Sequence, residues 1–295
     1  MANGIIIIDK PPLWTSHDVV AKLRGKLKEK RIGHAGTLDP MATGVLPVFV
    51  GRATRAVEFA AEGEKEYVAG LRLGVVTDTQ DLTGTVLEER PAEAGREELE
   101  AVLARFRGNI LQIPPMYSAI KRDGKKLYEL ARKGKEVERE PRPITIHALE
   151  LLPAGADEHA QTGGDYLLRV RCSKGTYIRT ICHDVGAALG CGGTMASLRR
   201  TMACGFTLDD AVPLDKVLEA EDPQALLLPV DAYFSDRPIV LLQPDAERKL
   251  RNGMTLPAPA LAPGEYRVYG EGNAFLALCR AAEGRLTTIK SFYEV

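Results

Sequence analysis

The sequence predicts an α+β fold in which helices flank a mixed, mostly antiparallel central sheet. Predicted strands and helices alternate without a regular βαβ period, and many predicted strands follow one another closely. The pattern also changes after about residue 237, where short strands surround a single helix. We therefore expect a large domain at residues 1–236 and a small β-rich domain at residues 237–295.

The first half of the chain holds several clear element patterns. The apolar run at residues 5–8 predicts a buried strand at Gly4–Asp9, and Ser16 is a suitable cap for the next helix. That helix has an apolar stripe formed by Val19, Val20, Leu23 and Leu27. Alternation or helical spacing predicts strands at Val45–Val50, Glu66–Leu73 and Thr85–Glu89, and helices at Arg52–Ala61 and Glu97–Arg107.

The second half begins with a segment that has no clear strand or helix pattern. Residues 114–142 are basic and punctuated by glycine, which indicates an exposed excursion. Strands are predicted at about residues 143–152 and 165–173, and a helix starts after Gly175-Thr176. The C-terminal part is predicted to contain strands at Ile239–Leu242, Tyr266–Gly270, Phe275–Cys279 and Thr287–Tyr293, and a helix at Pro244–Arg251.

The net charge of −1 hides two basic segments. Residues 1–55 carry nine Lys and Arg against four Asp and Glu, and residues 121–142 carry nine against five. Such segments on a neutral protein suggest a local anionic partner, although a solvated, salt-bridged face explains them equally well.

Cysteine usage and hydropathy bound the setting of the protein. The five cysteines include no CxxC pair, which favours buried structural thiols in a reducing cytoplasm. Cys182-His183 and Cys191 match no zinc-ligand spacing, so we expect no metal there. No run of 18 apolar residues occurs, and we therefore expect no membrane-spanning helix.

The segment GHAGTLDPMATGVLP, residues 33–47, gathers turn-forming residues around one carboxylate, Asp39. Three interpretations are open: a surface turn begun by Asp-Pro, a phosphate loop without the usual lysine, or a catalytic carboxylate. The chain has no GxxxxGK[ST], no GxGxxG after a strand, no HExxH and no GxSxG. These absences remove the common nucleotide-binding, metalloprotease and α/β-hydrolase assignments.

A second candidate segment is CSKGTYIR, residues 172–179. It combines a strand end, a glycine turn and a helix start, a common place for a functional site. Arg179 at this point can pair bidentately with a carboxylate or a phosphate. A surface arginine in the first helical turn is the alternative.

The extended segment GHAGTLDPMATGVLPVFVGRATR strongly resembles the catalytic motif of the TruB family of pseudouridine synthases. The resemblance covers about residues 4–210, and it includes DKPPLWTSHDVVAKLR, KEYVAGLRLGVVTDTQDLTG, IPPMYSAIKRDGKKLYELARKG, CSKGTYIRTICHDVG and LRRTMACGF. It implies the pseudouridine synthase fold with a short C-terminal PUA-like RNA-binding domain at residues 237–295. It also implies isomerisation of uridine to pseudouridine in RNA without a cofactor or metal.

The resemblance assigns three catalytic residues. Asp39 matches the essential aspartate, and Arg179 matches the arginine that would pair with it and hold its pKa down. Tyr67 matches the tyrosine that stacks on the target base and helps to remove the carbon-5 proton. Leu71 and Leu73 share its strand face, so a core tyrosine remains the alternative.

Four further residues are assigned to the RNA or to the pocket. Tyr177 and Leu198 match positions that line the catalytic pocket, whose apolar wall would strengthen the ion pair. His34 matches the histidine that fills the space vacated by the flipped uridine, with a turn histidine as the alternative. Lys10, in a Lys-Pro signature, is expected to be structural or RNA-adjacent rather than catalytic.

The implied partner is tRNA, modified at uridine 55 of the TΨC arm. The lysine-rich helix and the excursion at residues 114–142, which resembles a mobile RNA-clamping segment, would contact phosphates. We expect a cytoplasmic, monomeric enzyme that needs no guide RNA. The alternative from another class is a non-catalytic RNA-binding or tRNA-folding module.

Overall fold

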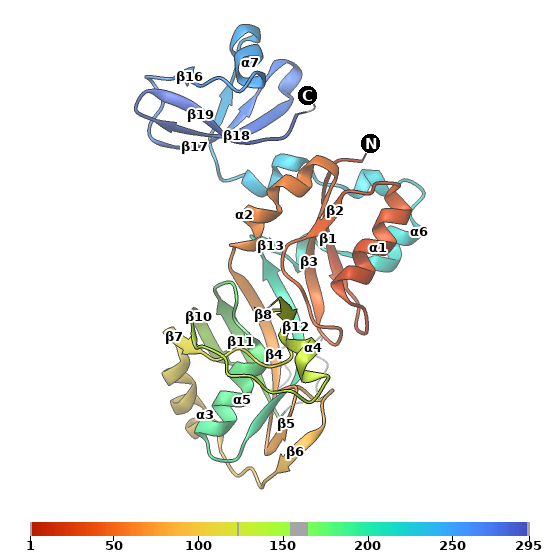
Figure 1. Ribbon diagram of the computed structural model, residues 1–295, viewed down its shortest axis with the longest axis vertical. Helices are drawn as coiled ribbons and strands as arrows, with labels where there is room; N and C mark the ends of the chain where they lie inside the picture. Colours follow the sequence, from red (N-terminus) through yellow and green to blue (C-terminus); the bar gives the residue numbers. More distant parts are fainter. Residues whose placement is uncertain (1, 123, 154–164, 294–295) are drawn as a thin grey trace.

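The computed structural model describes residues 2–122, 124–153 and 165–293, so that residue 123 of the excursion lies outside the described residues. The large mixed sheet occupies the middle of the molecule (Figure 1). In the described chain its main path has the order β14 (Val212–Pro213), β1 (Gly4–Lys10), β3 (Thr43–Val50), β12 (Gly193–Ala203), β4 (Lys65–Leu73), β11 (Tyr166–Cys172), β10 (Arg142–Leu151) and β7 (Gly108–Gln112).

Two short strands join the sheet beside this path: β2 (Ile32–His34) pairs with β3, and β13 (Phe206–Thr207) pairs with β12. The β1–β14 and β3–β12 pairs are parallel, and the other pairs described in this sheet are antiparallel. This confirms the predicted mixed, mostly antiparallel sheet.

The alternation of β1 shows how the sheet is covered on both faces. Ile6 and Ile8 join a core with the helices α1 (Ser16–Leu27) and α5 (Ile178–Ala188). Ile5 and Ile7 point into a second core, which includes residues of η1 (Gly51–Ala56), α2 (Val57–Ala61) and the C-terminal sheet. Because successive strand side chains alternate, one apolar run supplies both cores.

The remaining helical elements of the described chain are short. They are α3 (Arg96–Leu103), α4 (Leu127–Ala131), α6 (Leu214–Glu219), α7 (Pro244–Arg251), η2 (Ala104–Phe106), η3 (Leu208–Asp210), η4 (Pro223–Leu226), η5 (Val230–Phe234) and η6 (Glu271–Asn273). The predicted helix at Arg52–Ala61 is therefore split between η1 and α2, and the one at Glu97–Arg107 ends as a 3₁₀ turn.

The start of α1 differs from the prediction in a way that matters for the site. Thr15, not Ser16, is the N-cap, and it forms a capping box with Asp18. The buried Ser16 hydroxyl instead accepts a hydrogen bond from the Leu38 amide at 2.9 Å. The helix is therefore tied to the segment that carries Asp39.

A second sheet lies at the C-terminal end of the molecule. Its described order is β15 (Ile239–Leu241), β17 (Gly264–Tyr269), β18 (Phe275–Ala282), β19 (Arg285–Ser291) and β16 (Leu256–Pro257). Phe234 contacts Phe275 and Phe292, with ring centroids 6.3 and 5.8 Å away, and so joins this sheet to the rest of the chain. The expected boundary at residues 236–237 stays a prediction.

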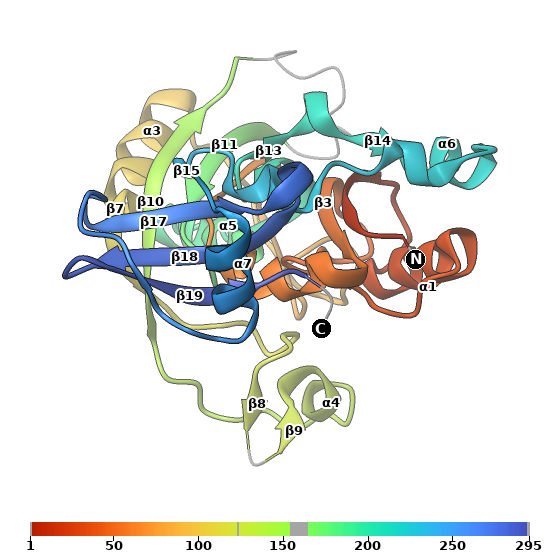
Figure 2. The ribbon, with the colours of Figure 1, turned by 90° about the horizontal axis from the view of Figure 1, so that it is seen from above.

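The excursion contains a small hairpin, β8 (Lys121–Arg122) and β9 (Lys125–Lys126), followed by α4. Figure 2 shows hairpin and helix standing off from the main sheet. A further hairpin, β5 (Val75–Thr77) and β6 (Val86–Glu89), continues from the end of β4.

The central strand β12 was not among the predicted strands. Its segment GTMASLRRTMA carries two adjacent arginines and no strict alternation, whereas a buried strand usually has an apolar pattern. The close parallel approach to β3 depends on Gly44, because a Cβ there would lie 2.2 Å from the Arg200 carbonyl oxygen. Arg200 itself is completely buried.

Leu13 is held in an unfavourable conformation beside this region. Its backbone is left-handed (φ 68°) and its side chain is 86% exposed. The left-handed conformation costs an L-residue other than glycine roughly 1–2 kcal/mol. Glycine avoids this cost, but the greater entropy of its unfolded chain cancels about 0.5–1 kcal/mol of the gain. We expect Leu13→Gly to raise the free energy of unfolding by about 0.5–1 kcal/mol, measured by urea denaturation. The control Leu87→Gly, in the extended strand β6, should lower the free energy of unfolding. A lower free energy of unfolding for Leu13→Gly would contradict the prediction.

Candidate active site

The loop between β2 and β3 presents Asp39 and is anchored on both sides. The Asp39 carbonyl accepts from the Ala42 amide at 3.0 Å, which closes the turn. The Pro40 carbonyl accepts from the Leu13 amide at 2.8 Å and from the Lys10 ammonium at 3.3 Å. With the Ser16 contact to Leu38, these bonds fix the direction of the carboxylate.

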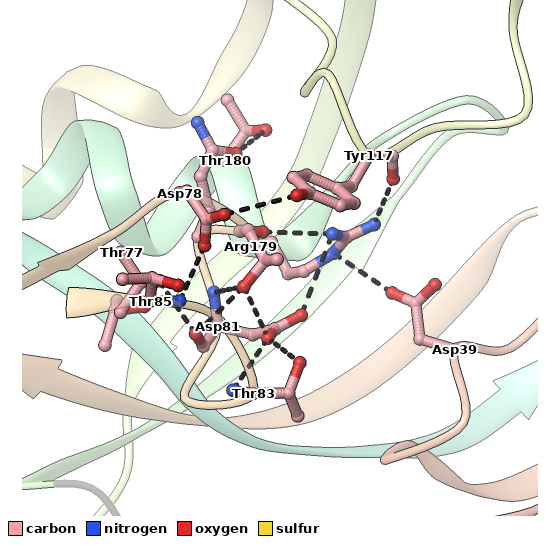
Figure 3. A network of polar contacts seen from close by, with 12 residues as sticks. Asp39, Thr77, Asp78, Asp81, Thr83, Thr85, Tyr117, Arg179 and Thr180 are labelled. Atoms are coloured by element: carbon pink, nitrogen blue, oxygen red, sulfur yellow. Dashed lines mark hydrogen bonds and ion pairs between the residues drawn. The ribbon is translucent and has the colours of Figure 1, made fainter. Parts of the chain in front are cut away.

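Asp39 forms an ion pair with Arg179, the second residue of α5. The Arg179 Nε lies 3.0 Å from the Asp39 Oδ2, and the arginine side chain is only 7% exposed. Its Nη1 donates to the Thr79 carbonyl at 3.0 Å and its Nη2 to the Tyr117 carbonyl at 2.9 Å (Figure 3). Arg179 is therefore not a surface arginine: it joins the Asp39 loop, the β5–β6 turn and the start of the excursion.

A second carboxylate, Asp81, stands on the other side of Arg179. Its Oδ2 lies 3.7 Å from the Arg179 Nη1, and its Oδ1 accepts from Thr83 and Thr79 (Figure 3). Asp81 was not among the candidate residues predicted from the sequence. The available signal was its place in the motif GVVTDTQDLTG, but the contact with Arg179 is set by tertiary structure.

The protonation of Asp39 reflects two opposing effects. Burial raises the pKa of Asp39 above its ordinary value of 3.8, and the Arg179 charge lowers it without fully compensating. The Asp81 charge raises it a little further. Arg179 thus acts in the expected direction, but the desolvation of the carboxylate within the protein outweighs it, while 38% of the Asp39 side-chain surface stays exposed.

The cavity beside this ion pair has a volume of about 770 Å³. Five residues singled out in the sequence line it: Asp39, Tyr67, Tyr177, Arg179 and Leu198. They come from the β2–β3 loop, β4, the α5 start and β12, so the sheet and its loops bring together residues that lie far apart in the chain. The excursion closes one side, since its residues Tyr117, Ser118, Ala119, Tyr128 and Arg132 also line the cavity.

The aromatic and apolar residues of the cavity have defined supports. Tyr67 is nearly buried on β4, and burial raises the pKa of its hydroxyl. Tyr177 caps α5 at its N-terminus, and the Gln112 side chain bonds both its amide and its carbonyl, at 2.9 and 3.0 Å. Leu198 is buried on β12 opposite Ala69 of β4.

His34 and Lys10 are not among the residues that line this cavity. His34 ends β2 and packs its ring edge-on against His17, with centroids 5.5 Å apart. Burial and the neighbouring positive groups lower the pKa of His34 to about 4, so its ring is neutral at pH 7. A neutral ring suits stacking and is a poor proton donor.

Lys10 is completely buried at the end of β1. Its ammonium donates to the carbonyls of Pro11, Trp14 and Pro40, at 2.9, 2.7 and 3.3 Å. Burial lowers the pKa of Lys10 to about 8. Of the two roles left open by the sequence, this geometry favours the structural one, in which Lys10 holds the loop that carries Asp39.

The cysteines of the described chain are not among the residues that line this cavity. All five cysteines are free and buried in the described chain, which confirms the structural assignment, and burial raises the pKa of Cys182 to about 12.

Among the described residues, no group of three or more His, Cys, Asp and Glu could hold a metal ion. No helix in the described ranges has the length and apolar character that a membrane span requires.

Comparison with solved structures supports the fold. The chain superposes on a Cbf5–Nop10–Gar1 complex with a TM-score of 0.73 and 26% identity, covering 99% of this chain and 85% of that one. A structure of an H/ACA RNP bound to a substrate RNA containing 2′-deoxyuridine gives a TM-score of 0.72 and 25% identity, with the same coverage.

Comparison of sequences identifies the family. Residues 24–178 match the model of the TruB family pseudouridylate synthase N-terminal domain, and residues 179–235 match the tRNA pseudouridylate synthase B C-terminal domain. The tRNA pseudouridine synthase B of Ralstonia nicotianae is 46% identical, covering 95% of this chain and 90% of the relative. That of Clostridium kluyveri is 39% identical, covering 98% and 99%. With its fold and sequence in agreement, the chain belongs to the TruB family of pseudouridylate synthases.

Proposed function

We propose that this protein isomerises uridine to pseudouridine in tRNA, at position 55 of the TΨC arm. The observation that carries the proposal is the Asp39–Arg179 ion pair, which lies in the wall of a cavity shared with Tyr67. The named relatives support tRNA as the substrate, and the motif resemblance supports the T arm as its site.

The reaction breaks the bond between N1 of the base and C1′ of the ribose and forms a bond from C5 to C1′. C5 loses a proton and N1 gains one, so the atoms and electrons balance without a redox cofactor. Attack of Asp39 on the base, attack on the sugar and abstraction of a sugar proton each require the ionised carboxylate. Arg179 favours that form, and the Tyr67 ring offers a face for the base.

A uridine within a folded RNA loop must leave its stack before it can reach this cavity. Flipping costs a few kcal/mol, which stacking on Tyr67 and burial in the cavity would offset. We assign neutral His34 to the space that the uridine leaves. We assign the phosphate contacts to exposed lysines in and just after α1 (Lys22, Lys28 and Lys30) and to the exposed lysines of the excursion. Two other residues of the excursion, Tyr128 and Arg132, already line the cavity.

Release of tritium from tRNA transcripts carrying [5-³H]uridine tests this function. We expect wild-type protein to release the label of one uridine per tRNA, since only C5 of the target base loses its hydrogen. A transcript with cytidine at position 55 should release none. Binding of the uridine transcript without release would refute the proposal and favour the alternative, a non-catalytic RNA-binding or tRNA-folding module.

A further inference from the structure

Arg200 lies at the centre of the main sheet and has no role in the reaction described so far. It is on β12, between β3 and β4, where its Cα is in register with Gly44 on one side and with Tyr67 on the other. Arg200 is among the largest side chains that are fully buried, with an exposed fraction of 0%. A charged group in such a place needs hydrogen-bond partners to offset the loss of water.

Two of the three guanidinium nitrogens have backbone partners at the active site. The Nε donates to the Val45 carbonyl of β3 at 2.7 Å, and Nη2 donates to the Gly36 carbonyl at 3.1 Å. Gly36 begins the turn that leads to Asp39, so these bonds tie the catalytic loop to β12. A Cβ at Gly36 would lie 3.3 Å from Nη1, which shows how closely the loop covers the guanidinium.

The third nitrogen, Nη1, is buried and has no hydrogen-bond partner among the described residues. Arg200 also lines the cavity of Asp39 and Tyr67. A buried donor without a hydrogen-bond partner is energetically costly, so the site should contain an acceptor for it. Lys65, which lines the same cavity, already has backbone acceptors, since its ammonium donates to the Gly63 carbonyl at 2.6 Å and the Ala61 carbonyl at 3.3 Å.

The Tyr67 hydroxyl is the acceptor that the geometry offers. Tyr67 is the cross-strand neighbour of Arg200 and lines the same cavity. The two groups are close enough to be electrostatically coupled: burial raises the pKa of Tyr67, and the Arg200 charge is the strongest effect that opposes the rise. The Cys172 and Asp39 charges act on the same hydroxyl but raise its pKa.

We propose that Arg200 is a positioning residue that acts through Tyr67, its free Nη1–H holding the Tyr67 oxygen so that the ring keeps a fixed place in the cavity. This inference rests on the proposed function for its effect on turnover. The contact between the two side chains does not depend on that function. Arg200 thereby couples the Asp39 loop, through Gly36, to the aromatic face against which the base is placed.

A double-mutant cycle tests the effect on turnover. We expect Arg200→Met to lower kcat about ten- to hundredfold, the range for loss of a charged hydrogen bond, with tRNA binding within about twofold of wild type. In the Tyr67→Phe background the same change should have little further effect, because the hydroxyl is already gone. Equal losses in both backgrounds would overturn the inference. The neighbour Arg199, which pairs with Asp9 at 2.9 Å, supplies the control Arg199→Met, expected to leave kcat unchanged.

A second measurement is independent of catalysis. The ¹³C NMR spectrum of protein labelled with [ζ-¹³C]tyrosine has one signal for each tyrosine, and the signal that is missing from the Tyr67→Phe spectrum belongs to Tyr67. We expect Arg200→Met to shift this Tyr67 signal at pH 8. An unmoved signal would overturn the inference whether or not the protein is active. If Arg200→Met shifts the signal but the wild-type protein releases no tritium, only the proposed function is overturned. If Arg200→Met fails to fold, Arg200→Lys replaces it, since one ammonium cannot bond Val45, Gly36 and Tyr67 together.

Discussion

Asp39→Asn is expected to abolish pseudouridine formation while tRNA binding survives. The amide has the size of the carboxylate but carries no negative charge, so it can serve neither as the nucleophile nor as the base. It can still occupy the loop, whose anchors are the backbone bonds of Asp39 and Pro40 and the Ser16 contact to Leu38. We expect tritium release to fall by on the order of a thousandfold or more, while the tRNA Kd from filter binding changes by less than about threefold.

The matched control is Asp245→Asn, which changes an exposed carboxylate paired with Arg248 on the surface of α7. Surface ion pairs contribute about 0–1 kcal/mol, so this variant should behave like wild type in both assays. Measurable release by Asp39→Asn, or loss of tRNA binding together with intact turnover, would contradict the assigned role of Asp39.

Arg179→Met is expected to lower turnover strongly and to move the acid limb of the pH–rate profile upward. The carboxylate of Asp39 must be ionised, so activity falls as the pH drops through the pKa of Asp39. That pKa is already raised by burial, and Arg179 is the strongest effect that lowers it. Its removal therefore raises the pKa further, and the limb appears at higher pH. We expect kcat at pH 7.5 to fall about 10²- to 10³-fold.

The same substitution should also weaken the fold, because it leaves the carbonyls of Thr79 and Tyr117 without their donor and the nearly buried Asp81 without its cation. A lower Tm is therefore expected beside the kinetic change. Arg179→Lys keeps the charge and should restore most of the acid limb but not kcat, since one ammonium cannot span three segments. An unchanged acid limb in Arg179→Met would show that Asp39 is not the titrating group.

Local sequence patterns were sufficient for much of the framework. The apolar run of β1, the alternation of β4 and the stripe of α1 each record how one element is buried, and the structure has these elements within a few residues of the predicted bounds. The change after residue 237 likewise predicted the separate C-terminal sheet. By contrast, β12 was not predicted, because its adjacent arginines are not typical of a buried strand, although it lies between β3 and β4.

The motifs of the chain were enough to indicate the family and the residues that could take part in chemistry, because a motif consists of residues that are close together in the sequence. The resemblance predicted the Arg179–Asp39 pair, and the structure has it at 3.0 Å. Only the tertiary structure shows that Asp81 shares this arginine and that Arg200 lies beside Tyr67. It also decided that Lys10 turns its ammonium to backbone carbonyls instead of solvent. Periodicity reports whether a side chain is buried, whereas its partner is set by strand order and loop path, which bring distant parts of the chain together.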